Sequence, residues 1–139
     1  MIFAAACVIG WPAATAAPSA RSARPATCLR VPAALVSVLR ASLSFSAGGN
    51  LLYARAVKSP KVASVYFLSA QIRSEQLGAK RPLGTWVVDK LQASATASPL
   101  NAAARAYSDL ATPDAGTVRI TMASPGALAS QTCVRKLIR

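Results

Sequence analysis

The sequence predicts a small, partly irregular and mainly α-helical fold, with three or four short helices, one or two short strands and an extended N-terminal segment. The helices are expected because a serine directly precedes a proline at three places, and helix-compatible residues follow each pair. The strands are expected at residues 84–91 and 117–122, and the second of these alternates between apolar and polar side chains. The three pairs are Ser59-Pro60, Ser98-Pro99 and Ser124-Pro125.

The N-terminal part of the chain is basic and free of carboxylates, and the first acidic residue is Glu75. Prolines interrupt residues 1–30, where Ala, Ser, Thr and Arg dominate, so this stretch is expected to lack structure of its own. Leaders that are rich in Arg and Ser and poor in acids are typical of organelle import. We therefore expect residues 1–40 to be a targeting-like or extended segment, and residues 41–139 to form a small, mainly helical body.

A secretory signal peptide is an alternative interpretation of the same N-terminus. The apolar run from Ile2 to Trp11 has the length of a signal-peptide core, and the small residues around Ala16 and Ala17 offer a cleavage site. Against this interpretation, no Lys or Arg precedes Ile2, although signal peptides usually begin with a positive charge.

A first helix is expected to start at Pro32, because Leu35, Val38, Leu39 and Leu43 then fall on one side of it. Glycines at positions 48 and 49 can end this helix. Its only charged residue is a cation on the opposite side. An import receptor recognises an amphipathic helix of this kind, but a helix of a hydrophobic core has the same pattern, so both interpretations stay open.

Each serine–proline pair is expected to begin one further helix. These helices would cover residues 60–77, 99–111 and 125–139, and a glycine or proline follows the first two. Because a single strand cannot satisfy its backbone alone, the strand at 117–122 must pair with residues 84–91 or with a neighbouring chain.

The charged residues argue against an enzyme. The chain of 139 residues has a formal net charge of +12 and no histidine, so it lacks the usual base for a serine or cysteine nucleophile. The four acids are too scattered to predict a pair of carboxylates in one pocket. We expect no catalytic residues, no cofactor and no metal site. The acids are Glu75, Asp89, Asp109 and Asp114.

The three cysteines, Cys7, Cys28 and Cys133, are too widely spaced for a metal-binding or redox pair. If a long leader is removed, Cys133 remains alone and is expected to be a small buried apolar residue. A cysteine-dense secreted scaffold is therefore not predicted. No apolar run reaches the roughly 18 residues that a membrane-spanning helix needs, so no transmembrane helix is predicted.

Basic clusters are the one functional signal in the sequence. A positive field favours anionic partners such as RNA, anionic lipid or acidic protein surfaces. Tyr53 and Trp86 lie near two of the clusters and are candidates for stacking on nucleic-acid bases. The residues expected to contact an anionic partner are Lys58, Lys61, Lys80, Arg81, Arg135, Lys136 and Arg139.

These observations predict a non-enzymatic, basic accessory subunit of a large organellar assembly, mitochondrial before plastid, such as a respiratory or ATP-synthase complex. It would have a structural role and would be ordered mainly by docking onto larger protein subunits, with anionic lipid as a further partner. One alternative is a mitochondrial ribosomal protein that contacts rRNA. Another is a secreted or periplasmic binding protein with a signal peptide, and a third is the product of a non-functional reading frame.

Overall fold

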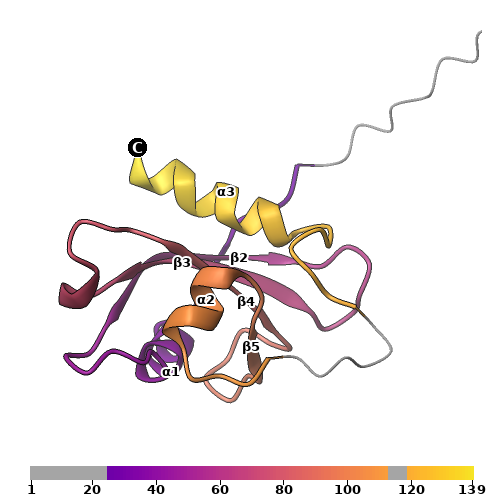
Figure 1. The fold of residues 1–139 in the computed structure, drawn as a ribbon. Coiled ribbons are helices and arrows are strands. Elements are labelled where there is room, and N and C mark those ends of the chain that lie inside the picture. The colour runs from indigo at the N-terminus through magenta and orange to yellow at the C-terminus, as the bar shows by residue number, and fades with distance from the viewer. Residues whose placement is uncertain (1–24, 113–118) are drawn as a thin grey trace, which may run out of the picture.

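A single antiparallel sheet organises the computed structural model, which describes residues 25–112 and 119–139. Its five strands follow one another in the order β1-β2-β3-β4-β5, so each strand pairs with its neighbours in sequence (Figure 1). The strands are β1 (Leu29–Arg30), β2 (Asn50–Lys58), β3 (Tyr66–Arg73), β4 (Leu83–Val88) and β5 (Ala97–Pro99). The helices are α1 (Ala33–Ala41), α2 (Ala102–Tyr107) and α3 (Ala127–Ile138), with a 3-10 turn η1 (Glu75–Leu77).

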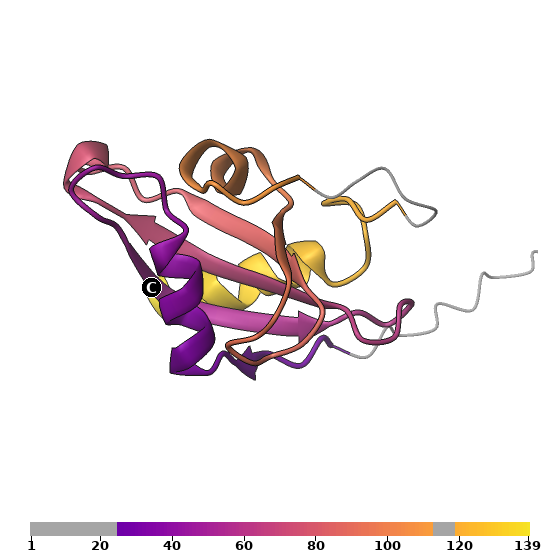
Figure 2. The ribbon, with the colours of Figure 1, turned by 90° about the horizontal axis from the view of Figure 1, so that it is seen from below.

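Helices cover both faces of this sheet. Helix α3 lies across one face, and α1 and α2 lie against the other (Figures 1 and 2). The first helix and the last helix of the described chain therefore pack on opposite sides of the same strands. The result is a three-layer arrangement with an apolar core on each side of the sheet.

The predicted mainly α-helical fold class is wrong, and the central strand β3 shows why. All residues from Phe67 to Ile72 are buried, with exposed fractions between 0 and 7%. A strand covered on both faces appears in sequence as a continuous apolar run without alternation. Such a run also places apolar residues at helical spacing, and this produced the prediction of a helix over residues 60–77.

Local capping explains the rest of that error. The Ser59 hydroxyl accepts a hydrogen bond from the backbone N–H of Val62 at 3.1 Å, as a helix cap would. Here the bond closes a turn that leads into β3, and no helix follows it. Serine side chains support turns and helix starts through the same hydrogen bond, so the pair Ser59-Pro60 does not distinguish them.

The remaining predicted elements have mixed outcomes. The helix expected from residue 32 corresponds to α1, the strand expected at 84–91 overlaps β4, and the helix expected from residue 125 corresponds to α3. Residues 119–122 are not a strand, and residues 117 and 118 lie outside the described part of the chain. The helix expected over 99–111 is the shorter α2.

The side chain of Asn101 caps the start of α2. The sequence predicted Ser98 as this cap. The Asn101 carboxamide oxygen accepts from the backbone N–H of Ala104 at 3.0 Å and from that of Thr85 at 3.1 Å. Its amide nitrogen donates to the Leu83 carbonyl at 2.8 Å. One side chain therefore caps α2 and fixes it to β4, while Ser98 and Pro99 belong to β5.

Helix α1 packs as a core helix. Leu35 and Leu39 are 0% and 1% exposed and contact the sheet, together with the fully buried Trp86. The boundary expected between residues 40 and 41 falls inside α1, so the structured body includes β1 and most of this helix.

The indole ring of Trp86 is tightly packed. A Cβ atom at Gly84 would overlap this ring and lie 2.9 Å from Ile72 Cδ1.

Beneath α3 the sheet carries a buried network of hydroxyl groups. The Ser69 hydroxyl lies 2.9 Å from the Thr85 hydroxyl and 2.7 Å from that of Ser130, and the Gln131 amide donates to Thr85 at 3.0 Å. All four side chains are less than 9% exposed. Buried polar groups are stabilising only when they have partners, so this network specifies the position of α3 over β3 and β4.

A disulfide joins Cys28 to Cys133, with the two Cα atoms 5.7 Å apart. It connects the residue before β1 to the middle of α3 across 105 positions of sequence. The expectation that Cys133 stands alone applied to a chain whose leader has been removed, whereas in the full chain Cys28 is its partner. The bond ties the N-terminal segment to the C-terminal helix.

Substitution of Gly84 by Ala is expected to lower the free energy of unfolding by about 1–3 kcal/mol, because the new methyl group overpacks against Trp86. Urea denaturation measures this change. The double variant Gly84→Ala/Trp86→Leu removes the clashing ring atoms, so its loss should be smaller than the sum of the two single losses. Additive losses would contradict the proposed contact.

Replacement of both Cys28 and Cys133 by Ser is expected to cost about 2–5 kcal/mol, because a cross-link across a long loop restricts the unfolded chain. Urea denaturation of the oxidised protein, the double variant and the protein with reductant provides the measurement. The variant and the reduced protein should unfold at the same lower midpoint. A midpoint unaffected by both changes would contradict the stabilising role of the bond.

Candidate anion-binding site

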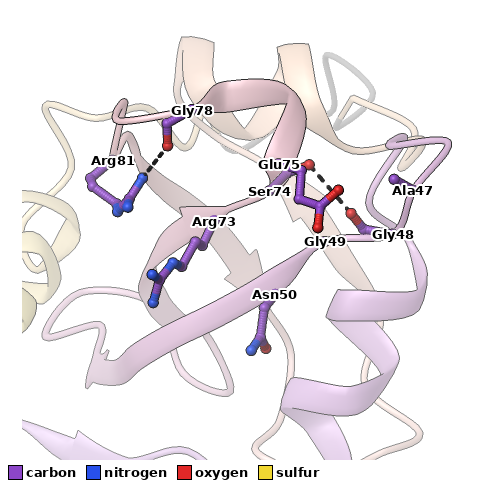
Figure 3. Close-up of a pocket in the computed structure, with 9 residues that line it drawn as sticks. All are labelled: Ala47, Gly48, Gly49, Asn50, Arg73, Ser74, Glu75, Gly78 and Arg81. Atoms are coloured by element: carbon purple, nitrogen blue, oxygen red, sulfur yellow. Dashed lines mark hydrogen bonds between the residues drawn. The ribbon is translucent and has the colours of Figure 1, made fainter.

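A polar hollow lies at the end of the sheet where β2 begins and β3 ends (Figure 3). Its volume is about 450 Å³. The Ser74 hydroxyl donates to the Gly48 carbonyl at 3.3 Å, so the loop before β2 is tied to the residue after β3. The residues lining the hollow are Ala47, Gly48, Gly49, Asn50, Arg73, Ser74, Glu75, Gly78 and Arg81.

Two arginines give this hollow its charge. Arg73 is the last residue of β3, and Arg81 donates to the carbonyls of Gly78 at 2.6 Å and Lys80 at 3.0 Å. Both arginines lie on one side of the hollow and Glu75 lies on the other (Figure 3). Two guanidinium groups against one carboxylate favour an anion, since arginine binds carboxylate and phosphate groups through paired donors.

The last turn of α3 carries a second group of cations. Arg135, Lys136 and Arg139 are exposed there, and Arg135 donates to the Gln131 side chain at 3.1 Å. Leu137 and Ile138 lie between them and are 39% and 41% exposed. The last turn of α3 therefore exposes apolar and cationic side chains next to one another.

The elements that carry these two groups of cations lie toward the same end of the molecule. The C-terminus of α3 and the turn η1 lie toward one end of the sheet in two perpendicular views (Figures 1 and 2). We call this surface the cationic end, and it consists of Arg73, Arg81, Arg135, Lys136 and Arg139.

The predicted cations do not form one site. Lys58 is the last residue of β2 and Lys61 follows it, and near this end of the strand Lys61 and Arg119 line a separate hollow of about 320 Å³. Lys80 is exposed on the loop after η1. Arg73 and Arg119 are not among the cations that the sequence predicted to bind an anionic partner. The signal for Arg73 was its place at the end of a buried run, which becomes visible only once that run is assigned as a strand.

The two aromatic residues predicted to stack on nucleic-acid bases differ in exposure. Trp86 is fully buried, and its indole N–H has no hydrogen-bond partner, so the prediction that it stacks on nucleic-acid bases is wrong. Tyr53 is 45% exposed and lies in a β-bulge between Leu52 and Arg55, with a backbone φ of 59°. One exposed aromatic side chain remains where two were expected.

One of the described acids, Asp89, supports a turn. The Asp89 carboxylate accepts from the backbone N–H of Thr96 at 2.8 Å, which closes the connection between β4 and β5. Within residues 25–112 and 119–139, no group of three or more His, Cys, Asp or Glu residues is placed to hold a metal ion. In the same part of the chain, no helix combines the length and the apolar character needed to cross a bilayer.

Comparison with known proteins gives no relative: no protein-family model, curated protein or solved structure matches this chain. The functional argument therefore rests on the residues of this chain alone.

Proposed function

We propose that this chain is an exported, non-enzymatic binding protein whose cationic end docks onto an anionic membrane surface. The disulfide between Cys28 and Cys133 is the observation that carries the proposal. Disulfides form and persist in oxidising compartments such as the bacterial periplasm, the secretory pathway and the extracellular space. A fold that uses this bond to join its two ends is suited to such a compartment.

The position of Cys28 also separates export from organelle import. Removal of a leader of 40 residues would delete Cys28, β1 and nearly all of α1. It would leave Cys133 without its partner and uncover the apolar surface that Leu35 and Leu39 bury. Cleavage of a signal peptide after Ala16 or Ala17 would leave all these parts in the mature chain, so the fold supports the export interpretation.

The chemistry of the last turn of α3 supports a lipid partner. Cations attract anionic head groups, and each one near the surface adds about 1 kcal/mol. Leu137 and Ile138 are exposed beside them, and apolar side chains in this arrangement can enter the interface between head groups and acyl chains. RNA is less well supported because Trp86 is not accessible for stacking.

Export predicts a defined mature protein. Expression of the full chain in a bacterial host that secretes proteins should yield a product beginning at residue 17 or 18, with two hydrogens fewer than the reduced polypeptide. Intact-mass spectrometry with and without reductant measures both properties. A mature start beyond Cys28, or two thiols free to alkylate in the native protein, would contradict export.

Membrane docking predicts a charge-dependent affinity. Binding to vesicles that contain phosphatidylglycerol should weaken roughly 100-fold when Arg135, Lys136 and Arg139 are all changed to Gln, since three cations are lost. The change of Leu137 and Ile138 to Ser should also weaken binding, because their apolar contribution does not depend on charge. Vesicle co-sedimentation at fixed salt concentration provides the affinities.

A matched control removes the same number of charges elsewhere. Arg40 on α1, Lys90 between β4 and β5, and Arg105 on α2 are changed to Gln together. This variant should keep most of the affinity for anionic vesicles. Equal losses in the two triple variants would show a nonspecific effect of net charge, and equal binding to neutral vesicles would contradict the proposed partner.

A further inference from the structure

An apolar hollow lies at the opposite end of α3 from the cationic end. Its volume is about 740 Å³, within the range of roughly 300–1,000 Å³ typical of small-molecule sites. Its walls come from three places that are distant in sequence: the segment before β1, the end of β2, and the start of α3. The lining residues are Ala26, Thr27, Leu29, Val57, Lys58, Pro60, Pro125 and Gly126.

Among the described residues that line the hollow, Lys58 is the one that carries a charge. Every other lining side chain is apolar or absent, apart from the Thr27 hydroxyl. An apolar lining that includes one cationic residue matches a ligand that has a long apolar tail and one negative charge. The adjoining hollow that contains Lys61 and Arg119 shares Pro125 with this one, so the surrounding charge is also positive.

The base of the hollow is rigid. Val57 is 3% exposed, and Gly126 has a backbone φ of 101°, a conformation that glycine adopts readily. A Cβ atom at Gly126 would lie 3.0 Å from the Phe67 ring and 3.4 Å from Val57. The absence of a side chain there lets the start of α3 approach β2 and β3 closely.

The outer wall depends on the disulfide. Ala26 and Thr27 directly precede Cys28, and the bond from Cys28 to Cys133 holds this segment against α3. The two residues are themselves exposed, so few other contacts retain them. The shape of the hollow is therefore coupled to the oxidation state of the protein.

We infer that this hollow binds a long-chain fatty-acid anion, with the alkyl chain against Leu29 and Val57 and the carboxylate beside Lys58. The site is distinct from the cationic end, and the inference does not rest on membrane docking. A failure of fatty-acid binding would leave the vesicle result unchanged.

The test uses the purified, oxidised full chain and isothermal titration with dodecanoate below its micelle concentration. One ligand should bind per chain, and affinity should rise about threefold to fourfold for each methylene added from octanoate to dodecanoate, as burial of alkyl surface requires. Dodecanol should bind more weakly than dodecanoate, and dodecyltrimethylammonium should bind more weakly than dodecanol because its head group is repelled by Lys58.

Three variants locate the ligand. Lys58→Gln should weaken dodecanoate binding about twofold to fivefold and leave dodecanol binding unchanged, as expected for loss of an exposed ion pair. Ala26→Trp should abolish binding of both by filling the hollow. The matched control Lys90→Gln removes one cation at a distance and should change neither affinity. Circular dichroism establishes that each variant is folded.

Reduction provides an independent readout. Reductant should weaken dodecanoate binding in protein that circular dichroism still shows to be folded, because the wall before Cys28 is released. The inference is overturned if dodecanoate does not bind saturably, if Ala26→Trp binds it normally, or if Lys58→Gln affects dodecanol as much as dodecanoate. Binding that appears only after removal of residues 1–24 would also overturn it, since the chain itself would then occupy the hollow.

Discussion

Strand β3 needs cover on both of its faces, and this requirement shapes the whole molecule. Six consecutive buried residues leave no face of the strand for solvent, so one helix must pack on each side of the sheet. The chain supplies α1 from between β1 and β2, and α3 from after the last strand. The fold is therefore incomplete until both ends of the chain have returned to β3, and the disulfide joins those two ends.

The two faces are held by different interactions. On the side of α1 and α2, leucines surround Trp86 in a continuous apolar cluster. On the side of α3, the apolar contacts centre on Phe67 and are supplemented by the hydroxyl network around Ser69. Apolar burial is nondirectional, whereas hydrogen bonds require defined geometry. The C-terminal helix is thus positioned by specific hydrogen bonds and by a covalent bond in addition to its apolar contacts.

The sequence predicted the helical ends of this domain better than its centre. Helices α1 and α3 were foreseen because apolar side chains lie on one side of each, with a proline at or near the start. Strand β3 was missed because two-sided burial removes the alternation that identifies strands. In β2, the extra residue at the bulge places Leu51 and Ala56 in the same core although an odd number of positions separates them. The candidate site could be predicted only in part for a similar reason. The sequence shows the cations, but which of them lie together depends on where the strands begin and end.

The outermost strands of the sheet are also its shortest: β1 has two residues and β5 has three, ending in Pro99. An unpaired strand border can recruit a second chain by backbone hydrogen bonding, and long flat borders lead to fibrous association. Here the length of backbone available for such recruitment is very small on both sides, and proline lacks the N–H group that recruitment uses. The two borders of this sheet therefore offer little backbone for polymerisation through strand pairing.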